Sequence, residues 1–361
     1  MKKGWQIKKL GDVCEFHKTQ GIHRGLPYVG LEHIESHTAC FIGSYKPQAV
    51  KSSTFRFSQK HLLYGRLRPY LNKVLAPDFE GHCSTEIFPI KPSALLVREF
   101  LLYWFLKTDT VDLIDSTCTG ARMPRANMQV VLSFDFPLPP LPEQHRIVSI
   151  LDEAFEKVAT AKANAEKNLQ NARALFESHL NIEHAEKALL GNLVIIKTGK
   201  LDANAAVEGG KYPFFTCSRD VFAIDTYAFD CEAILLAGNN AVGDFNVKHY
   251  NGKFNAYQRT YVITVNEKKR VLYRFLYFQM LKSLKKFKEQ SVGAGTKFLK
   301  LEMIKGLEID LPSLSEQQRI ISTLDAVRTE TQRLEAIYRQ KLAALEALKK
   351  SLLDQAFSGG L

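Results

Sequence analysis

The chain has 361 residues, which is too long for one ordinary hydrophobic core and fits two domains or one duplicated unit. Its 49 Lys and Arg residues outnumber 38 Asp and Glu residues, and the resulting net charge of +11 favours polyanionic partners such as nucleic acid. With 45% hydrophobic and 24% charged residues, the composition excludes a disordered basic tail.

Residues 1–6 lack the apolar run of a secretory signal peptide, and the longest apolar stretch, residues 94–106, is interrupted by Arg98 and Glu99. The six cysteines are scattered without a C-x-x-C pair, which indicates neither a zinc site nor a dense disulfide framework. We therefore expect a cytoplasmic protein with no membrane span and no bound metal.

The first globular part, residues 1–142, is predicted to be a mixed α/β domain. Alternating apolar residues over 84–90 indicate a strand, and residues 98–107 have the pattern of an amphipathic helix. Glycine and proline residues between these segments indicate exposed loops.

The segment that follows, residues 143–182, is predicted to be one long helix, and Pro142 suits its first turn. Apolar side chains recur at alternating steps of three and four residues, which is typical of a coiled-coil seam. The seam consists of Ile147, Leu151, Ala154, Val158, Ala161, Ala165, Leu169, Ala172 and Leu175.

The second globular part, residues 183–315, repeats the pattern of the first. A strand is predicted over 257–265 and an amphipathic helix over 272–284, in which Phe275 takes the place of Phe100. We therefore expect a second mixed α/β domain with a related core.

The last segment, residues 316–361, is predicted to be a second long helix. Ser315 to Gln318 have the form of a capping box, which marks a helix start. Its seam is richer in leucine and consists of Leu324, Val327, Thr331, Leu334, Tyr338, Leu342, Leu345, Leu348 and Leu352.

An internal repeat relates the two halves. Glu143 to Asp152 recur as Glu316 to Asp325, with seven of the ten residues identical. We call the separation between Glu143 and Glu316 the repeat offset. Upstream the offset is slightly larger, since residues 10–13 resemble residues 190–193. We predict an α+β architecture in which two mixed α/β domains are separated by a long antiparallel two-helix coiled coil; two independent amphipathic helices are the alternative.

Several candidate catalytic or metal patterns are incomplete. His33 and His37 lack the glutamate directly after the first histidine that a zinc protease needs. Asp78 and Glu86 hint at a nuclease, but Phe88 stands where its lysine is expected. Residues 293–297 invert the order of a P-loop ending. We expect no catalytic residue and no metal ligand on this chain.

Basic and amide side chains gather in turn-rich segments of both globular parts. Such side chains suit phosphate contacts and the reading of base edges, whereas a solvated surface is the alternative for any one of them. The candidate DNA-contacting residues are Arg66, Arg68, Asn72, Lys73, Arg122, Arg125, Asn127, Asn239, Asn240, Lys253, Tyr257, Gln258, Arg259, Thr296, Lys297 and Lys300.

Over its whole length the sequence resembles the specificity subunits of type I restriction–modification systems. The resemblance rests on the repeated segments 137–147 and 311–320 and on the closing segment 351–359. Shorter similar segments are 28–34, 119–125 and 211–216.

The resemblance implies target-recognition domains at 1–142 and 183–315, each reading one half of a bipartite asymmetric DNA site, with conserved helices at 143–182 and 316–361. It also implies two modification subunits that use S-adenosylmethionine to methylate adenine, and restriction endonuclease subunits that use ATP and Mg²⁺, with none of these cofactors bound by this chain. Left open are a DNA-binding coiled-coil protein with a methylation-only partner and a scaffold that does not bind DNA. If the helices set the half-site spacing, about four residues inserted after Asn171 lengthen it.

Overall fold

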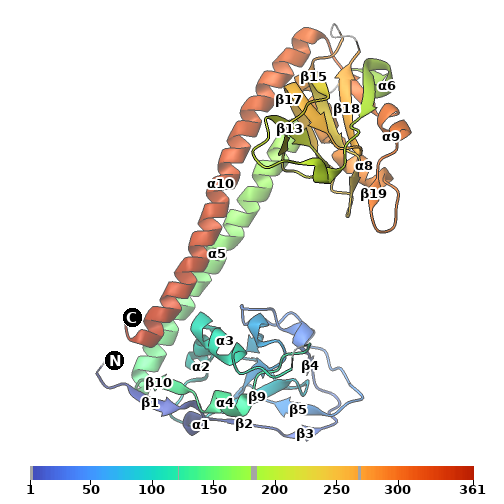
Figure 1. Cartoon of the computed structure of the whole chain (residues 1–361). Coiled ribbons are helices and arrows are strands. Elements are labelled where there is room, and N and C mark those ends of the chain that lie inside the picture. Colours follow the sequence, from blue (N-terminus) through green and yellow to red (C-terminus); the bar gives the residue numbers. More distant parts are fainter. Residues whose placement is uncertain (1–2, 121, 180–184, 267–269) are drawn as a thin grey trace. The chain divides into compact units, whose positions relative to one another are not determined.

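The computed structural model describes residues 3–120, 122–179, 185–266 and 270–361. The chain divides into two compact units, one of residues 1–165 with 340–361 and the other of residues 166–339 (Figure 1). Each unit contains one globular part and half of each long helix. The predicted domain borders at 142 and 315 remain predictions, and the border at 182 lies outside the described residues.

Unit 1 begins with a short strand and helix that precede its main sheets. Its strands are β1 (Gln6–Lys9), β2 (Cys14–Phe16), β3 (Gln20–Gly21), β4 (Tyr28–Val29), β5 (Thr54–Phe57), β6 (Leu62–Gly65), β7 (Val74–Leu75), β8 (Gly81–Cys83), β9 (Ile87–Pro92) and β10 (Asp135–Leu138). Its helices are α1 (Leu10–Val13), η1 (Leu31–His33), η2 (Pro69–Leu71), α2 (Arg98–Leu106), α3 (Thr108–Asp115), α4 (Met128–Leu132) and the first part of α5 (Leu141–His179).

Unit 1 contains the sheets β2-β9-β6-β7 and β3-β5-β8-β4, and β1 pairs with β10 (Figure 1). Helix α2 covers the first sheet because its apolar face is buried, with Phe100, Leu101 and Phe105 fully inaccessible. The same core takes in Ile147 of α5 and Ala356 of α10 (Leu314–Ser358). Burial of each large apolar side chain contributes about 1.5–3 kcal/mol, so the helix ends are part of the unit 1 fold.

Unit 2 has a related order of elements. Its strands are β11 (Glu186–Leu189), β12 (Val194–Thr198), β13 (Tyr212–Phe215), β14 (Phe222–Ile224), β15 (Phe229–Ala237), β16 (Asn239–Asn240), β17 (Val247–Ala256), β18 (Thr260–Val265), β19 (Lys297–Phe298) and β20 (Glu308–Leu311). Its helices are α6 (Leu190–Leu193), η3 (Ala203–Ala205), α7 (Tyr273–Lys282), α8 (Leu284–Gln290), α9 (Leu301–Lys305) and parts of α5 and α10.

The main sheet of unit 2 has the order β12-β18-β15-β17-β13-β14, and shorter pairs join β11 to β20 and β16 to β19 (Figure 1). Helix α7 packs on β15 and β17 and buries Phe275 and Phe278 completely. Ile321 and Leu324 of α10 complete this core. Phe100 and Phe275 therefore play the same part in the two units, as the sequence predicts.

Helices α5 and α10 pack together and are antiparallel within each unit. In unit 1, Lys162 Nζ lies 2.8 Å from Glu346 Oε1, while the earlier residue Arg146 donates to the later carbonyl of Leu361. In unit 2, Arg173 pairs with Glu335 at 2.7 Å. The predicted antiparallel helix pair is therefore confirmed.

The seam differs from the prediction at three positions. Leu175 and Leu348 are 53% and 47% exposed, and Ala161 is also exposed, whereas Ala165 and Ala172 are buried as expected. One residue along a helix turns the side chain by about 100°, and Phe176, next to Leu175, packs against the unit 2 core instead. Tertiary packing near the sheets thus rotates the buried stripe away from a regular heptad.

The start of α10 also differs from the prediction. The helix begins at Leu314, and the hydroxyl of Ser313 accepts a hydrogen bond from the Glu316 amide at 3.3 Å. Ser313, rather than Ser315, therefore caps the helix, and this cap stands three residues before Glu316, whereas Ser315 stands three residues before Gln318.

The repeat extends to backbone geometry. Strands β1 and β10 pair in the same antiparallel manner as β11 and β20. The amide of Leu10 donates to the carbonyl of Phe134 at 2.9 Å, and the amide of Leu190 donates to the carbonyl of Leu307 at 2.8 Å. The two units therefore share these elements, whereas the two four-stranded sheets of unit 1 differ from the six-stranded sheet of unit 2.

Candidate nucleic-acid interface

Two loop segments of unit 1 that are distant in sequence meet after β6. The amide of Arg66 donates to the carbonyl of Glu86, and the carbonyl of Arg66 accepts from the amide of Ala126, both at 2.9 Å. The amide of Arg68 also donates to the carbonyl of Pro124 at 2.8 Å. The segments around Arg66 and Arg125, which both carry predicted DNA-contacting residues, thus form one surface.

Unit 2 builds the same arrangement from different residues. The amide of Gly238 donates to the carbonyl of Arg259, and its carbonyl accepts from the amide of Leu299, both at 2.9 Å. Strand β16 then pairs with β19, with Asn240 opposite Lys297. The predicted segments around Arg259 and Lys297 therefore lie together at the position equivalent to the unit 1 surface.

Glu86 organises the charges of the unit 1 surface. Its carboxylate accepts from Arg66 Nε at 3.0 Å and from Arg125 Nη2 at 3.0 Å. Partial burial raises the pKa of Glu86, but the hydrogen bonds from Arg125 and Arg66 lower it, and the net pKa lies below the ordinary value. The Arg66 guanidinium also lies 5.3 Å from the ring centroid of Phe88. The carboxylate stays ionised and holds both guanidinium groups in place.

Two predicted residues of unit 1 remain available to a ligand. Arg68 and Arg122 are exposed, and among the described residues neither side chain has a hydrogen bond or an ion pair. Arg68 has a φ of 52°, a left-handed conformation that L side chains rarely adopt, and it directly precedes η2.

Three predicted residues of unit 1 have structural roles. Asn72 is 1% exposed and donates to the carbonyl of Phe105, so it holds the turn before β7 against α2. Lys73 Nζ donates to the carbonyls of Leu31 and Ile34 at 2.7 and 2.8 Å. Asn127 caps α4 by accepting from two backbone amides. Polar side chains in a turn-rich segment often satisfy local backbone groups in this way.

The unit 2 surface surrounds a groove of about 560 Å³. Arg259 lies above the ring of Phe298 at 5.4 Å, and Gln258 donates to Asp202 at 3.3 Å. Lys300 is exposed and lines the groove beside both. A cation held against an aromatic ring, an amide and an exposed lysine offer donors to phosphate and to base edges.

The other predicted residues of unit 2 are divided between this surface and its surroundings. Lys253 is exposed and lies 4.7 Å from the ring centroid of Tyr227, while Tyr257 is half-buried and its amide donates to the carbonyl of Phe215. The oxygen of the Asn240 side chain accepts from the amides of Val242 and Asp244 and so shapes the turn. Asn239, Thr296 and Lys297 are half-buried at the β16 and β19 pair.

Gly293 fixes the turn that leads into β19. It has a φ of 116°, and a Cβ at this position would lie 2.0 Å from the carbonyl oxygen of Thr296. Only glycine fits this backbone. The turn allows Val292 and Phe298 to form a bridge, which places Lys297 next to Asn240.

Glu86 and Phe298 are the site residues that sequence reasoning missed. The repeat offset that relates the two helices also relates Glu86 to Arg259 and Arg125 to Phe298. The register of the strands agrees, since Ile87 opposes Gly65 in unit 1 as Thr260 opposes Ala237 in unit 2. Extending the offset into the globular parts reveals an acidic residue in one unit where the other has a basic one.

Metal and membrane features are absent from the part of the chain that the structure describes. Within it, no group of three or more His, Cys, Asp or Glu residues is placed to hold a metal ion. No helix in the described ranges combines the length and apolarity needed to cross a membrane.

Comparison with known proteins identifies the family. The profile of the type I restriction modification DNA specificity domain matches residues 2–170 and 183–346. The type I restriction enzyme EcoDI specificity subunit of Escherichia coli is 41% identical over 172 residues, which are 48% of this chain. The aligned region spans 37% of the length of that relative.

Solved structures show the same fold. A chain from a structure of complex assembly and conformational transition in the type I restriction–modification system has a TM-score of 0.79 and 20% identity, with 99% of each chain covered. The HsdS subunit from Thermoanaerobacter tengcongensis has a TM-score of 0.57 and 20% identity, with 100% of this chain and 98% of that chain covered. The profile matches in both halves show that this chain belongs to the family of type I restriction–modification DNA specificity subunits.

Proposed function

We propose that the chain is a non-catalytic subunit that reads a bipartite asymmetric DNA target, one half with each unit. Family membership implies DNA target recognition within a restriction–modification complex. The observation that carries the finer proposal is the pair of equivalent loop surfaces with different chemistry. Unit 1 presents Arg66 and Arg125 anchored by Glu86, whereas unit 2 presents Arg259 above Phe298. Unlike side chains at equivalent positions support two unlike half-sites.

We assign DNA methylation and cleavage to partner subunits. Two modification subunits supply S-adenosylmethionine and methylate an adenine in each half-site, and restriction endonuclease subunits supply ATP- and Mg²⁺-dependent cleavage. This chain directs both activities by fixing where they act. Its surplus of positive charge supports the DNA assignment, because phosphate contacts supply much of the affinity of such proteins.

Methylome sequencing tests the proposal. A host that expresses this chain with its modification partner is expected to carry methyladenine in one motif with two defined halves and an unread spacer. Replacement of residues 10–140 by the equivalent segment of another family member is expected to change one half only. A motif that is continuous, or that changes in both halves after the exchange, contradicts independent reading by the two units.

A further inference from the structure

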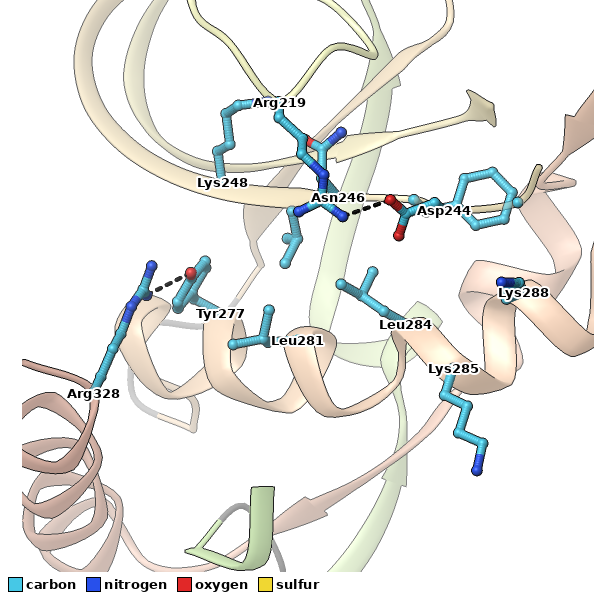
Figure 2. Close-up of a pocket in the computed structure, with 13 residues that line it drawn as sticks. Arg219, Asp244, Asn246, Lys248, Tyr277, Leu281, Leu284, Lys285, Lys288 and Arg328 are labelled. Atoms are coloured by element: carbon cyan, nitrogen blue, oxygen red, sulfur yellow. Dashed lines mark hydrogen bonds and ion pairs between the residues drawn. The ribbon is translucent and has the colours of Figure 1, made fainter. Parts of the chain in front are cut away.

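A basic cavity of about 390 Å³ lies within unit 2, outside the residues proposed above to read DNA. One wall is the segment from Gly243 to Lys248, which leads into β17, and the opposite wall is formed by α7 and α8 (Figure 2). The side chains of Leu281 and Leu284, on the wall formed by α7 and α8, are the apolar base of the cavity, and the side chain of Arg328 reaches the cavity from α10. The cavity is thus bounded by polar and charged groups above an apolar base.

Cations dominate the cavity. Asp244 is the carboxylate among its lining residues, and it is paired with Arg219 at 2.6 Å. Among the described residues, Lys248, Lys288 and Arg328 have no carboxylate within ion-pair distance. Arg328 instead donates to the hydroxyl of Tyr277 at 2.5 Å, and Lys285 points away from the cavity in Figure 2. The cavity therefore carries an uncompensated positive charge.

Lys248 is the most constrained of these cations. Its ammonium donates to the carbonyl of Ser218 and to the side-chain oxygen of Asn246, both at 2.6 Å. Burial lowers the pKa of Lys248, Cys217 and Asp220 raise it, and the nearby Arg219 lowers it, with a net shift downward. An ammonium has three donors, so one remains for an anion.

The cavity adjoins the unit 2 reading surface. A Cβ at Gly243 would lie 3.2 Å from Cγ of Lys288 in the cavity and 3.5 Å from Cγ of Lys297 in β19. Lys297 is paired with Asn240 in the reading surface. A duplex that lies on that surface therefore has backbone phosphates within reach of the cavity.

Among the described residues of unit 1, two positions equivalent to cations of this cavity are apolar. The pairing of β6 with β7 and of β15 with β17 makes Leu75 the equivalent of Lys248, and the repeat offset makes Phe155 the equivalent of Arg328. Leu75 is 4% exposed, and Phe155 packs against Tyr103. The positions of Lys248 and Arg328 are therefore apolar packing positions in unit 1.

We infer that the unit 2 cavity binds one backbone phosphate of duplex DNA beside the half-site read by unit 2, and that unit 1 lacks this anchor. The inference rests on the proposed DNA-reading function and adds an asymmetry to it. Phosphate oxygens accept hydrogen bonds from lysine and arginine without regard to the base, so the cavity contributes affinity and register but no sequence preference. An acidic patch on a partner protein is the competing occupant.

The first test measures the salt dependence of DNA binding by the complex with the modification partner. Lys248→Gln and Arg328→Gln are each expected to weaken binding about tenfold and to reduce the slope of log K against log salt by about 0.9. The methylated motif is expected to stay the same. Lys286→Gln is the matched control, because Lys286 is exposed on α8 but does not line the cavity. Lys288→Gln, an exposed position, provides the same test if the more buried variants unfold.

The second test locates the phosphate. Single uncharged methylphosphonate linkages are placed along both half-sites of the target. One position at the unit 2 half-site is expected to weaken wild-type binding while having little further effect on Lys248→Gln. An unchanged salt slope in all three variants, an altered motif, or loss of complex assembly with normal DNA binding overturns the inference. If the wild-type complex does not prefer its methylated motif over other duplexes, the proposed function itself fails.

Discussion

Gln144 and Gln317 make the same three hydrogen bonds in the two units. Gln144 accepts from the amide of Val97 at 2.8 Å and donates to the carbonyls of Leu95 and Pro139 at 2.9 and 2.8 Å. Gln317 accepts from the amide of Leu272 at 2.9 Å and donates to the carbonyls of Arg270 and Pro312 at 2.8 and 2.9 Å.

Both glutamines are fully buried, and each fastens a long helix to the start of the helix that covers the sheet. Val97 and Leu272 precede α2 and α7, whose first amides have no partner within the helix. The repeated pairs Glu143-Gln144 and Glu316-Gln317 therefore preserve the attachment of each long helix to the globular part of its own unit.

Replacing either glutamine by leucine is expected to destabilise its own unit. Gln144→Leu leaves the Val97 amide and two carbonyls without partners, and each buried unsatisfied group costs about 1–3 kcal/mol. Hydrogen exchange measures the effect: protection at Val97 is expected to fall in Gln144→Leu, and protection at Leu272 in Gln317→Leu. The exposed neighbour Gln318→Leu is the control. Equal loss of protection in both units from one substitution would contradict the independence of the two helix attachments.

The two arginines of the first loop surface are expected to act differently. Arg125 is oriented by Glu86, so Arg125→Ala is expected to relax one position of the first half-site at a cost of about 1–3 kcal/mol. The Arg122 side chain is exposed and has no partner among the described residues. Arg122→Ala is therefore expected to weaken binding to all DNA sequences alike and to reduce the slope of log K against log salt by about one.

Glu86→Gln tests whether the Glu86 carboxylate orients Arg125 for base reading. The substitution keeps the shape of the side chain but removes its charge, and is expected to relax the same position as Arg125→Ala. Methylome sequencing and salt titration of binding measure both effects. If Arg125→Ala and Glu86→Gln leave the motif intact, the pair serves the fold of the loop, and base reading in unit 1 lies with Arg68 and its neighbours.

A histidine pair is expected to make the stability of unit 1 depend on pH. His17 Nδ1 and His61 Nε2 are 2.8 Å apart, and the two rings stack with centroids 4.9 Å apart. Burial lowers the pKa of His61 from its ordinary value of 6.5, the hydrogen bond with the Ser58 backbone raises it, and His17 lowers it further, so the net shift is downward. The neutral ring is thus favoured in the folded state.

A lowered pKa in the folded state gives a stabilising contribution that is present above pH 6.5 and is lost as the pH falls through the folded pKa. The melting temperature of unit 1 is therefore expected to fall between about pH 7.5 and pH 5, and less so in His61→Gln. His145→Gln, on the exposed face of α5, should keep the wild-type dependence. An identical pH dependence in wild type and His61→Gln would show that other groups control acid stability.

The spacing of the half-sites is expected to follow matched changes in both helices. The unit borders fall inside α5 at 165 and inside α10 at 339. Seven residues inserted at each border preserve the heptad and add roughly 10 Å, or about three base pairs at 3.4 Å each. Methylome sequencing should show a longer spacer between unchanged half-sites.

The sequence alone predicts that four residues inserted after Asn171 lengthen the spacer, but the packing of α5 on α10 in unit 2 changes this expectation. Four residues added after Asn171 move Arg173 away from Glu335 and break the register of α5 against α10 in unit 2. Loss of stability, rather than a longer spacer, is then expected in thermal unfolding. An unchanged spacer in the matched double insertion would show that the helices do not set the spacing.

The sequence by itself determines the repeat, the two long helices and the covering helices with Phe100 and Phe275. These features depend on local periodicity and on capping residues, which are visible within a few turns of chain. The repeat offset relates Glu86 to Arg259 in the strands as it relates Glu143 to Glu316 in the helices, whereas Phe100 and Phe275 are slightly further apart.

Only the tertiary structure decided which of the candidate polar residues are exposed and which are held by the rest of the chain. Asn72 and Lys73 satisfy backbone carbonyls of segments that are distant in sequence, and Glu86 binds Arg125 across 39 residues of sequence. The seam at Leu175 also depends on the unit 2 core, which takes Phe176 instead. Hydrogen bonds and packing between distant segments follow from how the whole chain folds, so residue type and local spacing alone do not reveal them.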